Sequence, residues 1–311
     1  MTNLSLPKSH QIRSLEYINK EEYDQITHLM ELCCQQEKIN LKLELDYKLH
    51  LASIADRNTD KLSSDLNEFL YYVEEKLVAY LGICCFDGIT GEITGMTHPD
   101  YRGQGFITRL LELARKECGH RSFSKLLFLT DGNSQTGMEY VKRSALPYDH
   151  SEYRMKRLSA STAFCSETSA LTLRPACQED EPAIARMNHR IFNDSETNEH
   201  TGEPLIKSLA EDPENYKTYI IELAGERIGK INVEYYDNYA FITGFGIQSE
   251  YRGKGYGRTA LNATLKMIEA MNINTIELDV VCTNKQALPL YQSCGFQELS
   301  VMNYYLLPAI R

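Results

Sequence analysis

Two short glycine-rich segments of nearly the same sequence are the residues in this chain best suited to chemistry. YRGQGFI occupies residues 101–107 and YRGKGYG occupies residues 251–257. Glycines let a backbone turn sharply and approach a ligand closely. Where such a turn leads into a helix, its N–H groups face negative charge, so the pattern favours phosphate binding. Arg252, Lys254 and Arg258 add positive charge around the second segment.

The repetition extends well beyond the glycine segments, at an offset of 150 or 151 residues. Each segment follows an extended stretch and precedes an amphipathic helix, after which come a strand, an asparagine and, seven residues later, a tyrosine. The asparagines are Asn133 and Asn284, and the tyrosines are Tyr140 and Tyr291. One structural unit has therefore been used twice.

The elements that position these residues follow the same order in both halves. Each half opens with a strand and a helix, continues through a meander of strands, and ends in an aromatic strand. A stretch rich in small and hydroxylic residues lies between the halves. We predict an N-terminal domain at residues 1–158, a linker at 159–170 and a C-terminal domain at 171–311.

Composition limits the classes of function. The 311 residues suffice for two domains, and a net charge of -10 argues against nucleic-acid binding through a basic surface. The nine cysteines show no C-x-x-C spacing, which favours reduced thiols in a cytoplasmic protein without a metal site. No apolar run approaches the roughly 20 residues that a membrane span needs.

Three kinds of phosphate-binding loop compete for the glycine segments. A Walker A loop is excluded because no G-K-[ST] follows four variable residues. A dinucleotide fingerprint requires a βαβ unit, whereas a hairpin meander precedes these loops. The acyl-CoA pattern R/Q-x-x-G-x-G/A fits the second segment at Arg252, Gly255 and Gly257, and the first at Arg102 and Gly105.

The chain resembles the GNAT superfamily of acetyl-CoA-dependent N-acetyltransferases. The segments that carry the resemblance are residues 246–261 and 284–296, and the likeness covers nearly the whole chain as two tandem units. The tandem layout is similar to that of mycothiol synthase. The resemblance implies an α/β (α+β) fold of two GNAT-like domains, each a mixed, mostly antiparallel twisted sheet flanked by helices.

The resemblance also implies which residues bind acetyl-CoA. The loop N–H groups would hold the pyrophosphate, and the end of the preceding strand would run along pantetheine, with the Ile247 amide polarising the acetyl carbonyl. In the second half the implied residues are Gly246, Ile247, Gln248, Arg252, Gly253, Lys254, Gly255, Tyr256, Gly257 and Asn284. In the first half they are Thr97, Arg102, Gly103, Gln104, Gly105, Phe106, Ile107, Asn133 and Tyr140.

The catalytic residues implied by the resemblance lie in the second half. Tyr291 matches the tyrosine that protonates the departing CoA thiolate. Glu234 on an expected central strand is a candidate general base, although most strand glutamates are simply solvated. The first half departs from the family at Ile107, which replaces a small residue, and at 144–145, where Ser-Ala stands in place of Gly-Phe. We therefore expect the second domain to be catalytic.

The expected function is acetyl transfer from acetyl-CoA to a primary amine by direct attack in a ternary complex. The acceptor would be a small molecule, cationic if the acidic segment 193–204 recruits it, and neither nucleic acid nor membrane would be a partner. A non-catalytic acyl-CoA-binding or regulatory module is the alternative, and a nucleotide-binding protein is a weaker one. The acceptor's identity and the oligomeric state, monomer or homodimer, stay open.

Overall fold

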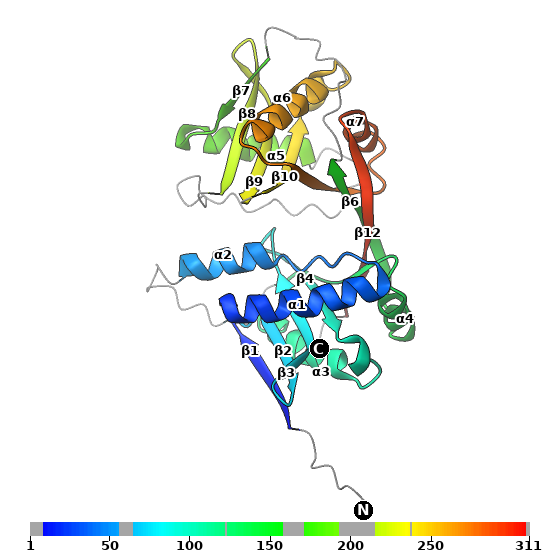
Figure 1. Ribbon diagram of the computed structural model, residues 1–311. Helices are drawn as coiled ribbons and strands as arrows, with labels where there is room; N and C mark the ends of the chain where they lie inside the picture. The colour runs from blue at the N-terminus through cyan, green and yellow to red at the C-terminus, as the bar shows by residue number, and fades with distance from the viewer. Residues whose placement is uncertain are drawn as a thin grey trace, which may run out of the picture. The chain divides into compact units, whose positions relative to one another are not determined.

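The computed structural model describes residues 9–55, 65–121, 123–157, 171–192, 215–236 and 238–308. The chain divides into two compact units (Figure 1). The first unit comprises Met1–His150 together with Met302–Arg311, and the second comprises Ser151–Val301. The predicted linker at 159–170 lies outside the described residues.

The first unit is a mixed sheet in the order β1-β2-β3-β4-β5-β12. All neighbouring pairs are antiparallel except β4 and β5, which are parallel. Its strands are β1 (His10–Leu15), β2 (Glu68–Val73), β3 (Lys76–Cys84), β4 (Thr90–Thr97), β5 (Lys125–Asp131) and the end of β12 (Phe296–Leu306). Its helices are α1 (Lys20–Glu37), α2 (Leu45–Ala55), α3 (Phe106–Cys118), α4 (Gln135–Arg143) and the short η1 (Pro99–Tyr101).

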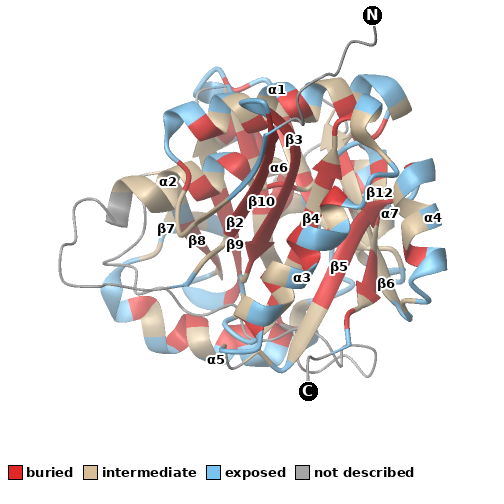
Figure 2. Cartoon of the chain, turned by 90° about the horizontal axis from the view of Figure 1, so that it is seen from below, coloured by how far each residue is buried: buried red, intermediate tan, exposed pale blue. Residues whose placement is uncertain are grey.

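Buried apolar residues on both faces of the first sheet explain its helical layers. Strand β2 is buried at every position, and β3 at every position after Lys76 (Figure 2). One cluster packs α3 against the sheet through Phe106, Leu110 and Ala114. A second cluster packs α1 through Ile26 and Leu29. The sheet is therefore sandwiched between helices, as its two-sided apolar strands require.

The second unit repeats this arrangement in the order β6-β11-β10-β9-β8-β7, with β10 and β11 parallel. Its strands are β6 (Tyr148–Arg157), β7 (Leu171–Pro175), β8 (Tyr216–Leu223), β9 (Glu226–Tyr236), β10 (Tyr239–Ile247) and β11 (Thr275–Val281). Its helices are α5 (Glu181–Phe192), α6 (Tyr256–Ala270), α7 (Ala287–Ser293) and the short η2 (Gln178–Asp180) and η4 (Ser249–Tyr251). The predicted fold, two tandem mixed sheets flanked by helices, is confirmed.

The last strand of each half completes the sheet of the other unit. Met302–Leu306 of β12 pair with β5 in the first unit, and residues 152–156 of β6 pair with β11 in the second. The compact units therefore differ from the predicted boundaries 1–158 and 171–311. The difference arises because the sequence repeat marks where each half ends in the chain, whereas hydrogen bonding decides which sheet a strand joins.

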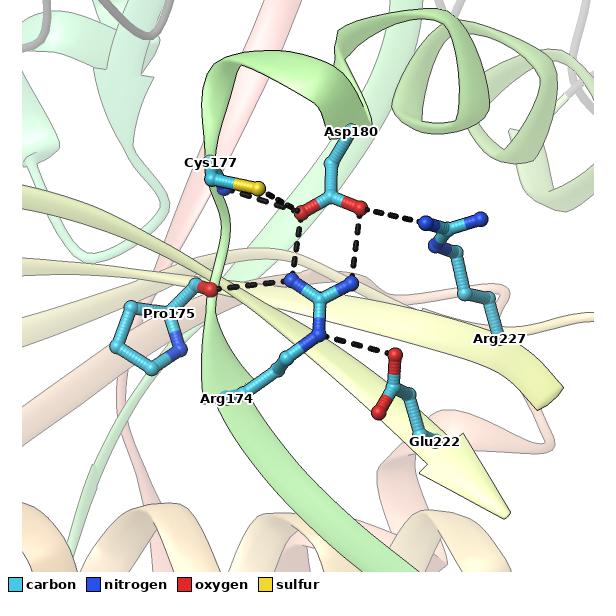
Figure 3. Close-up of polar contacts among 6 residues, drawn as sticks. All are labelled: Arg174, Pro175, Cys177, Asp180, Glu222 and Arg227. Carbon is cyan, nitrogen blue, oxygen red and sulfur yellow. Dashed lines mark hydrogen bonds and ion pairs between the residues drawn. The ribbon is translucent and has the colours of Figure 1, made fainter. Parts of the chain in front are cut away.

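A buried acid fixes the corner between β7 and α5. The Asp180 carboxylate accepts two hydrogen bonds from Arg174 at 2.5 and 2.8 Å and one from the Cys177 amide at 3.0 Å (Figure 3). Arg227 lies 3.0 Å from its other side, and Glu222 binds the remaining edge of Arg174. This network holds the start of α5, whose far end lies beside the second glycine segment.

Candidate active site

The second glycine segment forms an open turn between β10 and α6. Gly253 and Gly255 have φ angles of +75° and +84°, in the left-handed region that favours glycine. A Cβ atom added at either position would meet no atom within 4 Å. Gly255 is the N-cap residue of α6 and makes no side-chain cap bond. The turn therefore presents a helix N-terminus to open space, and a phosphate fits there.

The basic side chains of this segment brace the turn. Arg252 Nε donates to the Ile247 carbonyl at 2.7 Å, and its Nη2 donates to the Ile191 carbonyl of α5 at 3.2 Å. Lys254 Nζ binds the Glu250 carbonyl at 2.9 Å, while Arg258 Nε reaches Ser293 Oγ of α7 at 3.1 Å. Charge thus surrounds the turn, but the atoms positioned to contact a ligand directly are its backbone N–H groups.

A β-bulge interrupts the pairing of the end of β10 with β9. Thr243 pairs with Asn232 and Gly246 with Lys230, so β10 carries one extra residue. Gly244 lies in the bulge with a φ of +51°. Sequence reasoning did not identify this feature, although two glycines inside a strand are a signal for a bulge.

The parallel pairing of β10 with β11 covers only Tyr239–Ile242, so the two strands part after Ile242. The Gln248 amide donates to the Ile228 carbonyl of β9 at 2.9 Å. Successive amides of a strand point to opposite sides, so the Ile247 N–H points away from β9 toward the gap.

Tyr291 lies in α7, only 8% exposed, among aromatic side chains. Its ring centroid is 6.4 Å from that of Phe245 and 6.0 Å from that of Phe296. Burial raises the pKa of its hydroxyl, with a smaller contribution from Cys294, so the group keeps its proton at neutral pH.

Gly257 brings the turn, the strand end and α7 together. A Cβ at Gly257 would lie 3.5 Å from Leu290, 3.8 Å from Ile247 and 3.8 Å from the Phe245 ring. The structure thus gathers Ile247, Gly257 and Tyr291 around Phe245, a residue that sequence reasoning did not single out.

Other predicted residues support this arrangement. The Asn284 side chain accepts from the Ala287 amide at 2.9 Å and so caps the start of α7. Gln248 binds the Arg227 carbonyl through Nε2 at 2.7 Å. Gly246 lies against α5, where an added Cβ would approach Ile191 to 2.2 Å. Tyr256 begins α6 and packs against a small apolar cluster that includes Ile247.

Glu234 is not brought to this group. It pairs with Phe241, whereas Ile247 pairs with Gly229, five residues away on β9. That separation is about 16 Å at the rise of a strand. Its carboxylate accepts a hydrogen bond from the Tyr236 hydroxyl at 2.9 Å.

The first glycine segment has the same backbone geometry but different surroundings. Gly103 and Gly105 have φ angles of +75° and +81°, and Arg102 Nε donates to the Thr97 carbonyl at 3.3 Å. However, β4 pairs with β3 without a bulge. The Ile107 side chain lies 2.9 Å from where a Cβ on Gly95 would stand, so it covers the strand beside the turn.

The other residues predicted in the first half have structural contacts. Phe106 is buried against Tyr71, with ring centroids 4.5 Å apart, and Tyr140 packs on Phe128 at 5.4 Å. The Asn133 amide donates to Asp131 at 2.7 Å. Gln104 is exposed.

A family model for the acetyltransferase (GNAT) family matches residues 27–140 and 183–296, together most of the chain. The chain belongs to the GNAT family. Both matched segments contain one glycine segment and one of the repeated tyrosines. The family uses acetyl-CoA, so the open turn of this GNAT protein is the expected phosphate site.

Curated relatives of this GNAT protein share part of its length. A mycothiol acetyltransferase of Paenarthrobacter aurescens is 26% identical over 220 residues, covering 67% of each chain. An uncharacterized N-acetyltransferase of Bacillus subtilis is 43% identical over 63 residues, only 40% of its own length. An aminoglycoside N(6')-acetyltransferase of Stenotrophomonas maltophilia is 26% identical over 149 residues, 45% of this chain and 95% of the relative.

Solved structures with the same tandem fold cover nearly the whole chain. A GCN5-related N-acetyltransferase from Sphaerobacter thermophilus has a TM-score of 0.73 at 16% identity, covering 98% of both chains. A tandem GNAT protein from the clavulanic acid biosynthesis pathway has a TM-score of 0.71 at 13% identity, covering 97% of this chain and 99% of the other. These likenesses establish the tandem GNAT fold.

Among the described residues, no three His, Cys, Asp or Glu side chains are grouped as a metal ion would require. No helix within the described ranges is long and apolar enough to cross a membrane.

Proposed function

We propose that the second unit is the catalytic domain and transfers an acetyl group from acetyl-CoA to a primary amine of a small molecule. The observation that carries the proposal is the convergence of an open glycine turn, a bulged strand end and a buried tyrosine around Phe245. The glycine turn would bind the phosphates of the substrate. The strand end would donate a hydrogen bond to the oxyanion, and the tyrosine would donate a proton.

The backbone N–H groups of residues 253–257 would hold the pyrophosphate of the substrate, whereas the Arg252 N–H donates to the Ser249 carbonyl at 3.2 Å. Arg252 keeps this turn fixed to the strand end through the Ile247 carbonyl. The Ile247 N–H, directed into the gap beside β11, would donate to the acetyl oxygen and stabilise its negative charge during attack by the amine. Because the amine attacks directly, no covalent acyl-enzyme is needed.

Tyr291 would supply the proton that the CoA thiolate takes on leaving. Its buried hydroxyl retains its proton at neutral pH. The same desolvation makes a bare thiolate unfavourable, so it favours proton transfer from the tyrosine to the sulfur. Glu234 is left out of this mechanism because its strand position is remote from Ile247.

The acceptor is proposed only as a class. Relatives are named for mycothiol and for aminoglycosides, which are small molecules. The segment 193–204, where acidic residues were expected to recruit a cationic amine, lies outside the described residues. A panel of amines with acetyl-CoA, monitored by release of free CoA, tests the proposal. Tight CoA binding without turnover on any amine would favour the non-catalytic module instead.

A charge placed in the glycine turn tests the phosphate site directly. We expect Gly253→Asp to raise KM for acetyl-CoA at least 10-fold, because a carboxylate would repel the pyrophosphate. Gly253→Asn is the matched control, since asparagine has the same shape and both residues tolerate a left-handed backbone. Equal KM values for the two variants would rule out an anion at this turn.

A further inference from the structure

Glu37, the last residue of α1, joins two parts of the first unit that border its glycine segment. Its carboxylate forms an ion pair with Arg102 of that segment. The same carboxylate accepts hydrogen bonds from Ser134 Oγ at 2.7 Å and Thr136 Oγ1 at 2.8 Å, at the start of α4. The Glu37 side chain is only 10% exposed. It therefore links the turn after β4 to the helix after β5.

The surroundings of this carboxylate have the chemistry of an anion site. A guanidinium, two hydroxyl donors and the N-terminus of the nine-residue helix α4 converge on it. Burial alone would raise the pKa of Glu37. The hydrogen bonds from Ser134 and Thr136 and the charge of Arg102 outweigh that effect and lower it, so Glu37 stays ionised.

Neighbouring contacts hold the end of α1 over the same gap. Cys33 Sγ donates to the Thr97 carbonyl at the end of β4, at 3.4 Å. The Asn40 amide donates to Asp131 at the end of β5, at 3.0 Å. The β4–β5 pairing covers only Thr90–Ile93, so the strands part beyond it. The end of α1 and the residues that follow it thus contact the ends of both β4 and β5, where the two strands part.

The second unit has different residues at the equivalent positions. Lys285 and Ala287 stand where Ser134 and Thr136 stand in the first unit, so neither offers a hydroxyl. Arg252 binds backbone carbonyls, and among the described residues no carboxylate hydrogen-bonds to it. Within the described residues a carboxylate bridge is present in the first unit, and the residues that follow α5, 193–214, lie outside the described part of the chain.

We propose that Glu37 is an internal anion that occupies Arg102, Ser134 and Thr136 beside the first glycine segment and repels a second anion there, so that the chain binds one acyl-CoA and binds it in the second unit. The inference rests on the proposed function for the identity of the ligand. It assigns Glu37 a role that excludes a ligand: removal of its carboxylate frees Arg102, Ser134 and Thr136 for an external anion.

Binding stoichiometry of the full-length protein tests the inference. Isothermal titration with CoA should give one equivalent for the wild type and a second, weaker equivalent for Glu37→Ala. Adding Arg102→Ala to Glu37→Ala should remove the second equivalent. Glu31→Gln, which alters an exposed glutamate of the same helix, is the control and should bind one equivalent.

The outcomes separate this inference from the proposed function. Two equivalents in the wild type, or no gain in Glu37→Ala, would overturn it. A wild type that binds no CoA would contradict the proposed function. A gain of CoA binding in Glu37→Ala that depends on Arg102 would still support the role of Glu37 as an internal anion. If Glu37→Ala does not fold, the double variant Glu37→Gln/Thr136→Val takes its place. A second equivalent of bound CoA in that variant would support the inference, and its absence would overturn it.

Discussion

Tyr291 and Tyr140 occupy equivalent positions in the repeat but have different surroundings. Tyr291 is buried between Phe245 and Phe296, beside the bulged strand. Tyr140 is half-buried and packs on Phe128, beside a strand without a bulge. The same residue type at the same spacing is thus buried among aromatic rings in one unit and half-buried in the other, and we propose a proton-donor role only for Tyr291.

This contrast provides an internally controlled prediction. We expect Tyr291→Phe to lower kcat roughly 100-fold with little change in KM for acetyl-CoA, because only the proton donor is removed. Tyr140→Phe should leave both constants unchanged. Steady-state CoA release measures both variants, and equal rates for the two would remove Tyr291 from its assigned role.

The residues predictable from sequence are those whose function depends on local spacing. Gly253 and Gly255 were identifiable because a turn before a helix imposes a positive φ within a few positions. The Glu37 bridge was not identifiable, because it joins Glu37 to Arg102, which is 65 positions away in the chain, and to Ser134, which is 97 positions away. The sequence predicted that Glu234 lies on a central strand, but not the register of that strand, which places Glu234 far from Ile247.

At the scale of elements, the Arg174–Asp180 corner determines where α5 begins (Figure 3). Hydrogen bonds from Arg174, together with those from Cys177 and the charge of Arg174, hold the pKa of Asp180 well below its usual range. A lowered pKa in the folded state means that the ionised acid stabilises the fold. That contribution is complete above the ordinary aspartate pKa of about 4 and is lost as the pH falls below it.

We therefore predict that Asp180→Asn lowers the free energy of unfolding by about 2–3 kcal/mol at pH 7, through loss of charge-assisted hydrogen bonds. The difference from wild type should shrink as the pH falls below about 4. Urea denaturation at a series of pH values measures it, with Glu181→Gln, at the start of the same helix, as control. A difference independent of pH would contradict an ionised Asp180.

The bulge in β10 is an element that sequence reasoning reached only in part. The strand end and its Ile247 amide were predicted from the family resemblance, but the extra residue that shifts the register of β10 against β9 was not. A bulge depends on the pairing partner as well as on the strand, so Gly244 alone does not specify it. At the matching point of the repeat, β4 pairs with β3 without a register shift, although it parts from β5 after Ile93 just as β10 parts from β11 after Ile242.

At the scale of the whole molecule, the exchanged final strands set how the halves depend on each other. A chain of residues 1–158 lacks Met302–Leu306, which pair with β5. A chain of residues 171–311 lacks residues 152–156, which pair with β11. No local sequence signal shows which of two similar sheets a strand will join, so the repeat correctly predicted two units but not their exact membership.

We predict that neither half folds alone, because each leaves an apolar inner strand unpaired. Coexpression of 1–158 with 171–311 should restore a soluble complex, detected by copurification through a tag on one half. A full-length chain cut by a protease site inserted within 159–170 should stay associated. Independent folding of either half, observed by circular dichroism and cooperative unfolding, would contradict this dependence.

The placement of β12 also has a consequence for synthesis of the chain on the ribosome. The first unit contains β1 to β5, yet the strand beside β5 is made only after residues 151–301 of the second unit. The buried cluster that contains Leu127 and Leu129 is complete only once Met302 and Tyr304 have been synthesised. The sheet of the first unit therefore cannot be completed until β12 has been made, and the exposed edge of β5 has to avoid aggregation until then.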